Sequence, residues 1–373
     1  MPSTSDRTFA LLVGLCAAAF QLSIVHHFAI NVPFWDEWDD FVGFVAADRL
    51  GTLRWEHWVA PHMEHRIVVP RMVFLAVGRL FGEANLLALL AFSAALMGAI
   101  VAVWTYTLRR LQAPLWLVGA SLIVLLSFSQ YENMLWAFQT PFYVLMLAMI
   151  AAISGLAFAP RVSWRLTAGM AAAGILSSLS LVSGLVAWPI LGVLLALRLW
   201  LDGESFPRLP RERAAWARLA AFCLVGLATC GAYLTNYNPL HPPIAGGTVT
   251  MMLRWAGFAF GFPVLDPTNA REAAWLPLLL AVEAIPIVAA LVMYVRRRDR
   301  ARLILSVGIL LLVLLHVGSM AYGRSSAVWV ASRYGTVLLW GSAVSLLASA
   351  DLIVDSLRDL TPTSLRALIG SRK

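Results

Sequence analysis

The sequence predicts an all-α protein that crosses a membrane about ten times. Hydrophobic residues make up 60% of the 373 and charged residues only 13%, and the mean hydropathy is +0.78. A soluble domain carries about 25% charged residues, so this composition excludes a soluble globular fold. The charges also lie in short clusters between long apolar runs, as they do in polytopic proteins.

Ten apolar runs are long enough, or nearly so, to cross the hydrocarbon layer, which takes about 20 helical residues. They are residues 8–30, 84–108, 114–128, 141–159, 166–182, 184–201, 215–235, 274–295, 301–317 and 334–353. The first run begins like a secretory leader, but its apolar character continues to Ile30, which favours an uncleaved span. We expect one membrane domain over residues 1–353 and a short cytoplasmic tail over 354–373.

The distribution of charge orients these runs. With the N-terminus in the cytoplasm, 19 of the 28 basic residues fall in cytoplasmic segments, and 11 of the 20 acids fall outside. The basic residues form no single patch, so the net charge of +8 does not indicate a nucleic-acid partner. Lys373 is the single lysine, and such a bias toward arginine suggests a GC-rich bacterial genome. We expect a multi-pass protein of the bacterial inner membrane with both termini cytoplasmic.

Two periplasmic loops are long. The first, 31–83, contains two apolar segments, 38–50 and 67–81, which are too short to span. Residues 38–50 place Trp38, Phe41, Val42 and Val45 on one helical face, as an interfacial helix does. We expect both segments to form membrane-parallel helices. The second loop, 236–273, is long enough to form a lid or a substrate platform.

Four carboxylates follow the first run directly, in the segment NVPFWDEWDD. An ionised carboxylate at the membrane surface can take a proton from an acceptor while the acceptor attacks an activated sugar. We expect Asp36 to be this base and Glu37 to orient the acceptor, although Asp39 and Asp40 are alternative bases. Capping of the 38–50 helix, cation binding or a solvated face would also account for these acids.

A departing phosphate needs positive charge beside it, and a guanidinium fork matches phosphate oxygens. The candidate phosphate-binding residues are Arg66, Arg71 and Arg333. Arg333 and Tyr334 directly precede the last run, so an interfacial anchoring role explains them equally well. The candidate substrate-binding residues are Asp39, His62, Glu64 and Tyr334.

Three histidines, His57, His62 and His65, lie between the two loop helices, near Glu64. Their spacing matches no strong zinc motif, so we expect no metal ligands and no cofactor, with a divalent cation as the alternative. Hydrogen bonding or contact with the acceptor is the favoured role for these histidines. Within the membrane, Glu283 lies in the middle of its run, where a carboxylate should face a cavity or a partner.

This layout resembles that of the GT-C glycosyltransferases, such as protein O-mannosyltransferases and aminoarabinose transferases. The segments PFWDEWDDF, PHMEHRIVVPR and SRY (332–334) are also similar to those of bacterial membrane proteins with the same layout. The resemblance covers the first seven spans in topology but only a few residues in motif. It implies that Asp36 is the base, that Glu37 orients the acceptor, and that the donor lipid reaches the site under the 67–81 helix. The chain departs from the family in its extra acids and in the absence of a large outer C-terminal domain.

The sequence therefore predicts a glycosyltransferase that moves a sugar from a polyprenyl-phosphate donor to a lipid, glycan or protein acceptor on the outer face, with inversion at the anomeric carbon. The first alternative is a transporter or flippase for a lipid-linked saccharide, which would need polar groups between several spans and often two similar halves. The second alternative is a non-catalytic protein that binds the same lipid.

Overall fold

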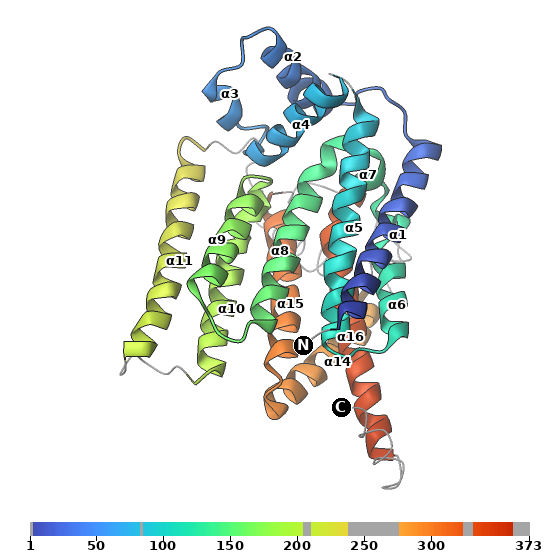
Figure 1. Cartoon of the computed structure of the whole chain (residues 1–373), viewed down its shortest axis with the longest axis vertical. Helices are drawn as coiled ribbons and strands as arrows, with labels where there is room; N and C mark the ends of the chain where they lie inside the picture. The colour runs from blue at the N-terminus through green and yellow to red at the C-terminus, as the bar shows by residue number, and fades with distance from the viewer. Residues whose placement is uncertain (1–2, 83–84, 204–209, 238–275, 324–330, 361–373) are drawn as a thin grey trace.

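The computed structural model describes residues 3–82, 85–203, 210–237, 276–323 and 331–360. These residues are almost entirely helical, and no strand forms among them beyond a single β-bridge between His62 and His65. Long helices stand side by side in a bundle, and short helices cover one end of it (Figure 1). We call this end the loop end. The first residues of the first helix and the last residues of the final helix lie at the opposite end.

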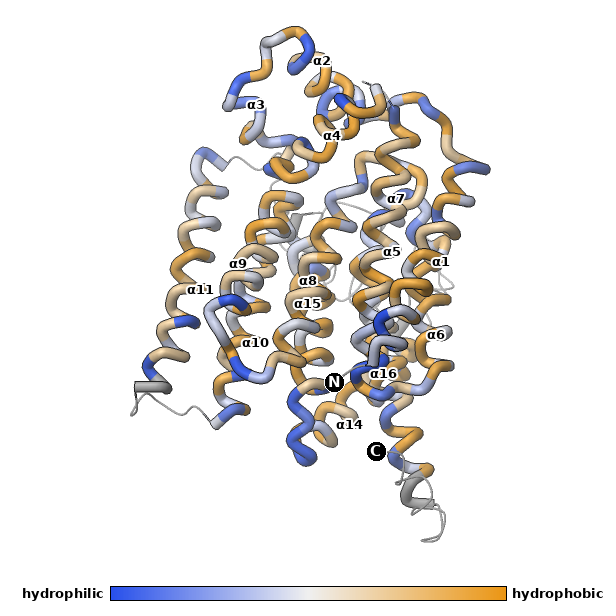
Figure 2. The backbone as a smooth tube through the Cα atoms, viewed as in Figure 1, coloured by the Kyte–Doolittle hydropathy of each residue, from blue (hydrophilic) through white to orange (hydrophobic). Residues whose placement is uncertain are grey.

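Nine helical segments of the described chain are long and apolar enough to cross a membrane, so the protein is a multi-pass membrane protein. Their main helices are α1 (Thr4–Phe28), α5 (Leu86–Arg110), α6 (Leu115–Leu125), α8 (Thr140–Phe158), α10 (Ala187–Leu201), α11 (Pro210–Leu234), α14 (Leu276–Arg297), α15 (Arg300–Gly323) and α16 (Gly335–Leu360). Apolar residues dominate the length of these helices, and hydrophilic residues gather toward their ends (Figure 2).

The fifth predicted run, 166–182, is the one without a helix long enough to span among the described residues, and it forms the shorter helix α9 (Trp164–Ser178), which packs against α8 and α11. Its 15 residues extend about 22 Å, less than the ~30 Å of a hydrocarbon core. The chain then turns through the 3₁₀ segment η4 (Val182–Val186), where Gly184 lies against the backbone of Ser177. A Cβ on Gly184 would stand 1.9 Å from the Ser177 carbonyl oxygen, so this turn requires glycine.

Backbone groups of this turn bond to the first loop. The Val69 N–H donates to the Leu179 carbonyl oxygen at 3.1 Å. The Val182 N–H donates to His65 Nδ1 at 3.2 Å. Non-helical backbone near a membrane must find such partners because lipid offers none. The first loop is therefore bonded to the bundle.

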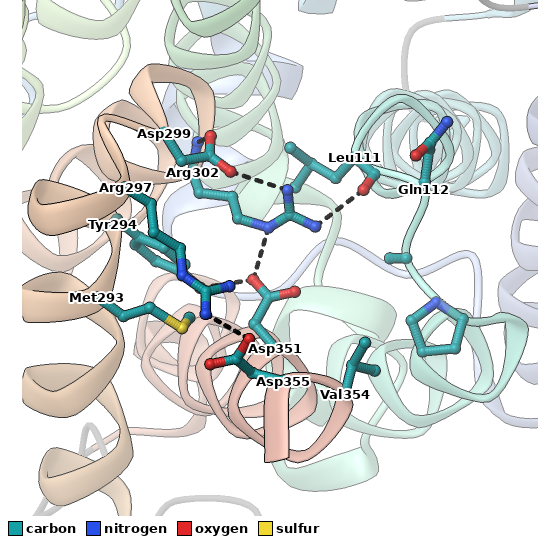
Figure 3. A pocket seen from close by; sticks show the side chains of 12 residues that line it. Leu111, Gln112, Met293, Tyr294, Arg297, Asp299, Arg302, Asp351, Val354 and Asp355 are labelled. Carbon is teal, nitrogen blue, oxygen red and sulfur yellow. Dashed lines mark hydrogen bonds and ion pairs between the residues drawn. The ribbon is translucent and has the colours of Figure 1, made fainter. Parts of the chain in front are cut away.

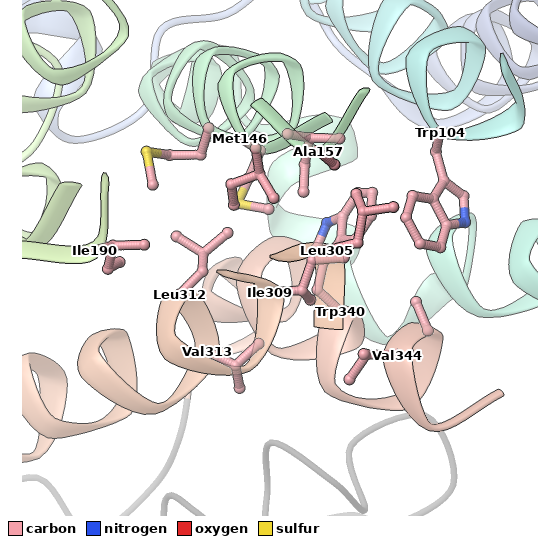
Figure 4. Packing of buried hydrophobic residues seen from close by; sticks show 14 of the residues in the cluster. Trp104, Met146, Ala157, Ile190, Leu305, Ile309, Leu312, Val313, Trp340 and Val344 are labelled. Atoms are coloured by element: carbon pink, nitrogen blue, oxygen red, sulfur yellow. The ribbon is translucent and has the colours of Figure 1, made fainter. Parts of the chain in front are cut away.

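The main core lies between α5, α8, α10, α15 and α16 (Figure 4). Trp104 and Trp340 meet edge to face within it, with their ring centroids 5.1 Å apart. The helix α1 packs on α5 through Gly14 and Gly98. A Cβ added to Gly98 would lie 2.7 Å from the Gly14 carbonyl oxygen, so the two backbones touch, as small residues allow in membrane helices.

Short helices form where the sequence predicts the two loop helices. Residues 37–49 form the π-helix η1 (Glu37–Val42) and then α2 (Gly43–Arg49), and α4 covers Val68–Phe81. A further short helix, α3 (Trp55–Val59), lies between them. Phe41, Val45 and Phe74 are buried together in a second, smaller core. Trp38, expected on the same apolar face, is instead 56% exposed, because the wider turn of a π-helix rotates it away from Phe41.

Arginine–aspartate pairs close the end opposite the loop. Arg302 donates to Asp299 and Asp351, and also to the Leu111 carbonyl oxygen at the end of α5. Arg297 pairs with Asp355 of α16. The helix α16 ends at Leu360, seven residues beyond the predicted end of its run at 353. These side chains line a polar cavity of about 220 Å³ (Figure 3).

Inside the bundle, the expected partner of Glu283 is present. Ser342 on α16 donates its hydroxyl to Glu283 Oε1 at 2.9 Å. The second long loop, 236–273, lies almost wholly outside the described residues, so its expected role as a lid stays a prediction.

The contact between α1 and α5 generates a prediction for stability. Gly98→Ala should lower the melting temperature by several degrees, because the added methyl group overlaps the Gly14 carbonyl and overpacking costs about 1–3 kcal/mol. Gly119→Ala is the matched control, since no heavy atom lies within 4 Å of its added Cβ. That change should leave the melting temperature unchanged or raise it, because alanine favours helices over glycine. Equal effects of the two substitutions in thermal unfolding would contradict the close contact.

Candidate functional site

The turn that follows α1 is held in place by Glu37. Its Oε2 accepts the Phe34 N–H at 2.8 Å, and its Oε1 accepts the Phe138 N–H at 3.2 Å. Burial raises the pKa of this carboxyl, and the two backbone hydrogen bonds oppose that rise. With only 2% of its surface exposed, Glu37 joins the turn before η1 to the turn before α8. These contacts give Glu37 a structural task and leave its predicted contact with an acceptor without support.

Asp40 and Arg71 form a buried ion pair between η1 and α4. Arg71 donates from Nε at 3.1 Å and from Nη2 at 2.5 Å, both to Asp40 Oδ1. Its Nη1 donates to the carbonyl oxygens of Trp58 and Ala60, so the guanidinium is committed to the protein. Burial would raise the pKa of Asp40, but hydrogen bonds and charge from His62 and Arg71 outweigh it and lower the pKa.

His62 lies between two carboxylates. Its Nδ1 contacts Asp40 Oδ2, and its Nε2 lies 3.6 Å from Asp36 Oδ2. Burial alone would lower the pKa of His62, but hydrogen bonding with Asp36 and Asp40 and their charge raise it to about 9. The imidazole is therefore cationic at neutral pH and links the two acids into one network.

Asp36 is the partly exposed member of this network. Its side chain is 30% exposed, whereas that of Asp40 is 7% exposed. It occupies the N-cap position of η1 but makes no side-chain capping hydrogen bond, so a capping role finds no support. Its Oδ1 has no partner among the residues that the structure describes. Asp36 thus presents one carboxylate oxygen beside a fixed cation.

The other predicted residues of the first loop lie in different surroundings. Asp39 is exposed, and Glu64 is half-buried, its carbonyl oxygen accepting the Tyr233 hydroxyl at 3.3 Å. Arg66 donates its guanidinium hydrogens to the carbonyl oxygens of Val59, Tyr233 and Thr235. Arg66 therefore ties the loop to the end of α11 and is not free to hold a phosphate in this conformation.

The three loop histidines do not converge. His57 Nδ1 accepts the Arg54 N–H at 2.9 Å, whereas His65 Nδ1 accepts the Val182 N–H at 3.2 Å. Within the described ranges, no group of three histidine, cysteine or acidic side chains has metal-binding geometry. The divalent-cation alternative thus gains no set of ligands here.

Arg333 approaches the same region from the other end of the chain. It lies in η5 (Ser332–Tyr334), where Glu132 of α7 (Tyr131–Leu135) accepts its N–H at 2.8 Å and its Nη1 at 3.3 Å. The guanidinium carbon also lies 5.9 Å from the Trp136 ring centroid and 5.4 Å from that of Tyr334. Its Nε and Nη2 donors have no acceptor among the described residues. Tyr334 packs its ring on Phe142, against the main core.

Trp136 contacts both Arg333 and the turn that precedes Asp36. Its ring centroid lies 5.7 Å from that of Phe34 and 6.1 Å from that of Trp35, on the turn before Asp36. Sequence reasoning missed Trp136 and gave Glu132 no role, because their partners lie far away in sequence. It also assigned no partner to Asp40, which the Arg71 and His62 contacts provide.

The charge on His62 predicts a pH dependence of stability. Because its folded pKa is raised to about 9, His62 contributes stability that is complete below the usual value near 6.5 and is lost as the pH rises through about 9. In melting curves from pH 6 to 10, His62→Gln should therefore be less stable than wild type at pH 6–7 and lose less stability above pH 8. His57→Gln is the control and should follow the wild-type curve. Parallel curves for wild type and His62→Gln would contradict the position of His62 between Asp36 and Asp40.

Comparisons with known proteins identify no relative. No protein-family model, curated protein or solved structure matches the chain. The resemblance to GT-C enzymes therefore rests on the layout and the segments quoted above. Function must be argued from the geometry of the site.

Proposed function

We propose that the protein is a membrane glycosyltransferase that transfers a sugar from a polyprenyl phosphate to an acceptor, with Asp36 as the general base. The observation that carries the proposal is that the clustered acids differ in burial and in hydrogen bonding. Glu37 and Asp40 are buried and committed to structural bonds, whereas Asp36 is partly exposed and retains an oxygen without a partner among the described residues. A general base needs such an accessible oxygen.

The proposed reaction is a single displacement. Asp36 takes the proton from an acceptor O–H or N–H group as the acceptor atom bonds to the anomeric carbon. The bond between that carbon and the phosphate oxygen breaks on the opposite face, so the configuration inverts. The phosphate leaves with its electron pair, and Arg333 supports its charge through Nε and Nη2, the donors for which the described residues offer no acceptor.

His62 suits this role as a positioning residue. Its cationic imidazole places positive charge 3.6 Å from Asp36 Oδ2 and so helps to orient the carboxylate. Asp40 and Arg71 hold the imidazole in turn. Of the three arginines considered for the phosphate, Arg333 is favoured, because the guanidinium groups of Arg66 and Arg71 already donate to several acceptors in the protein.

We also propose that the loop end faces the periplasm or exterior and the opposite end the cytoplasm. This orientation is supported by the excess of arginine in the segments assigned to the cytoplasm. The Arg297, Arg298, Arg300 and Arg302 cluster at the opposite end agrees with it. A donor lipid in the outer leaflet would then lie level with the first loop. The bacterial inner membrane is the proposed location.

The base assignment is tested by transfer in proteoliposomes that contain polyprenyl-phosphate sugars. Asp36→Asn should lower the rate at least about 100-fold, because it removes the proton acceptor while keeping the shape of the side chain. Asp39→Asn is the matched control, since Asp39 is exposed on the same turn, and it should retain nearly full activity. Normal transfer by a folded Asp36→Asn variant would reject the assignment. If lipid-linked sugar crosses the bilayer without transfer, the flippase alternative is correct.

The phosphate assignment is tested by varying the donor concentration. Arg333→Gln should raise the KM for the donor about tenfold or more, because it removes the charged donors proposed to bind phosphate. Arg54→Gln, an exposed arginine in the first loop, should leave this KM unchanged. If the two variants shift the donor KM equally, Arg333 makes no specific phosphate contact.

A further inference from the structure

Three aromatic side chains connect the turn before Asp36 with Arg333. Phe34 and Trp35 stack with their ring centroids 4.9 Å apart and their planes at 14°. Both rings meet Trp136 edge to face, and Trp136 lies beneath the Arg333 guanidinium. We call Phe34, Trp35 and Trp136 the aromatic ledge. It joins the proposed base to the proposed phosphate-binding group.

The backbone at Trp35 is strained. Its φ of +45° lies in the left-handed region, which costs a bulky residue about 1–2 kcal/mol. Hydrogen bonds on either side hold it there: Glu37 accepts the Phe34 N–H, and the Trp35 carbonyl oxygen accepts the Trp38 N–H at 3.1 Å. Strain of this kind persists only where the surrounding structure holds the residue in place, and it occurs often at functional sites.

An interfacial anchor does not explain this strain. A tryptophan that merely contacts headgroups can occupy many surface positions with relaxed backbone, as Trp38 does three residues later with 56% of its surface exposed. Trp35 is 68% exposed and Phe34 is 53% exposed, yet both are held against Trp136 beside Asp36. The strained turn thus holds both rings against Trp136, which in turn contacts Arg333.

We infer that the aromatic ledge binds the sugar ring of the donor and holds its anomeric carbon between Arg333 and Asp36. A sugar ring has a face of C–H groups that carry partial positive charge, and the face of an indole is negative, so the two stack favourably. The phosphate would then lie at Arg333 and the anomeric carbon would face Asp36. This inference rests on the proposed function and adds the group that recognises the sugar.

Equilibrium binding to the full-length protein in nanodiscs tests the inference. The probes are radiolabelled farnesyl phosphate and its conjugates with mannose, glucose, galactose and arabinose. Wild type should bind at least one conjugate about five- to tenfold more tightly than farnesyl phosphate, which corresponds to one aromatic contact. Trp35→Gly should remove this preference and leave the affinity for farnesyl phosphate unchanged, because glycine adopts a positive φ without strain. Trp38→Ala is the matched control and should keep the preference.

The outcomes separate the inference from the proposed function. If Trp35→Gly weakens binding of farnesyl phosphate and its conjugates equally, the ledge is a lipid anchor and the inference is wrong. The inference is also wrong if wild type binds farnesyl phosphate but prefers none of the conjugates, although the proposed lipid substrate then stands. If wild type binds neither farnesyl phosphate nor any conjugate, the proposed function itself fails.

Discussion

The loop end depends on the buried ion pair between Asp40 and Arg71. Each residue is 5% exposed, and a charge so deeply buried is tolerated only when it is paired and its remaining hydrogen-bonding groups are satisfied. Arg71 meets this condition by bonding to Asp40 and to two loop carbonyls, and Asp40 meets it by contacting His62 as well. Removing Asp40 would leave the buried Arg71 guanidinium without a counter-ion, and removing Arg71 would leave Asp40 with His62 as its remaining cationic partner. The pair therefore fixes η1 against α4, and this arrangement in turn places His62 beside Asp36.

The two ends of the bundle use charge differently. At the end opposite the loop, arginines are bound to aspartates and to carbonyl oxygens at helix ends, as Arg198 is to Asp202 and to the Leu156 carbonyl of α8. Such contacts satisfy helix C-termini and fasten neighbouring helices together. At the loop end, Asp36 has an acceptor oxygen and Arg333 has two N–H donor groups that none of the described residues bind. This difference, more than the number of charges, is why the loop end is the better candidate for chemistry.

Hydrophobic periodicity and run length were enough to predict the long helices and the two loop helices, because burial in lipid or against the bundle depends on local pattern. The roles of the clustered acids were not predictable. The roles of Glu37 and Asp40 differ from that of Asp36 because Glu37 bonds to Phe138 and Asp40 bonds to Arg71. Only the folded chain brings these partners near. The pairing of Glu132 with Arg333 spans 201 positions and has no local signal. Trp38 was misplaced because the sequence does not distinguish a π-turn from an α-turn.

The short α9 has a consequence for the height of the site. This 15-residue helix packs against α8 and α11, which have 19 and 25 residues, and the hydrogen bonds of Val69 and His65 join the first loop to the turn that follows it. The loop is thus fastened to the bundle at the end of this short helix. If the proposed function holds, chemistry beside this loop takes place at the ends of the spanning helices, where lipid headgroups reside, so a substrate anchored by a long isoprenoid tail would not have to be lifted out of the bilayer to react.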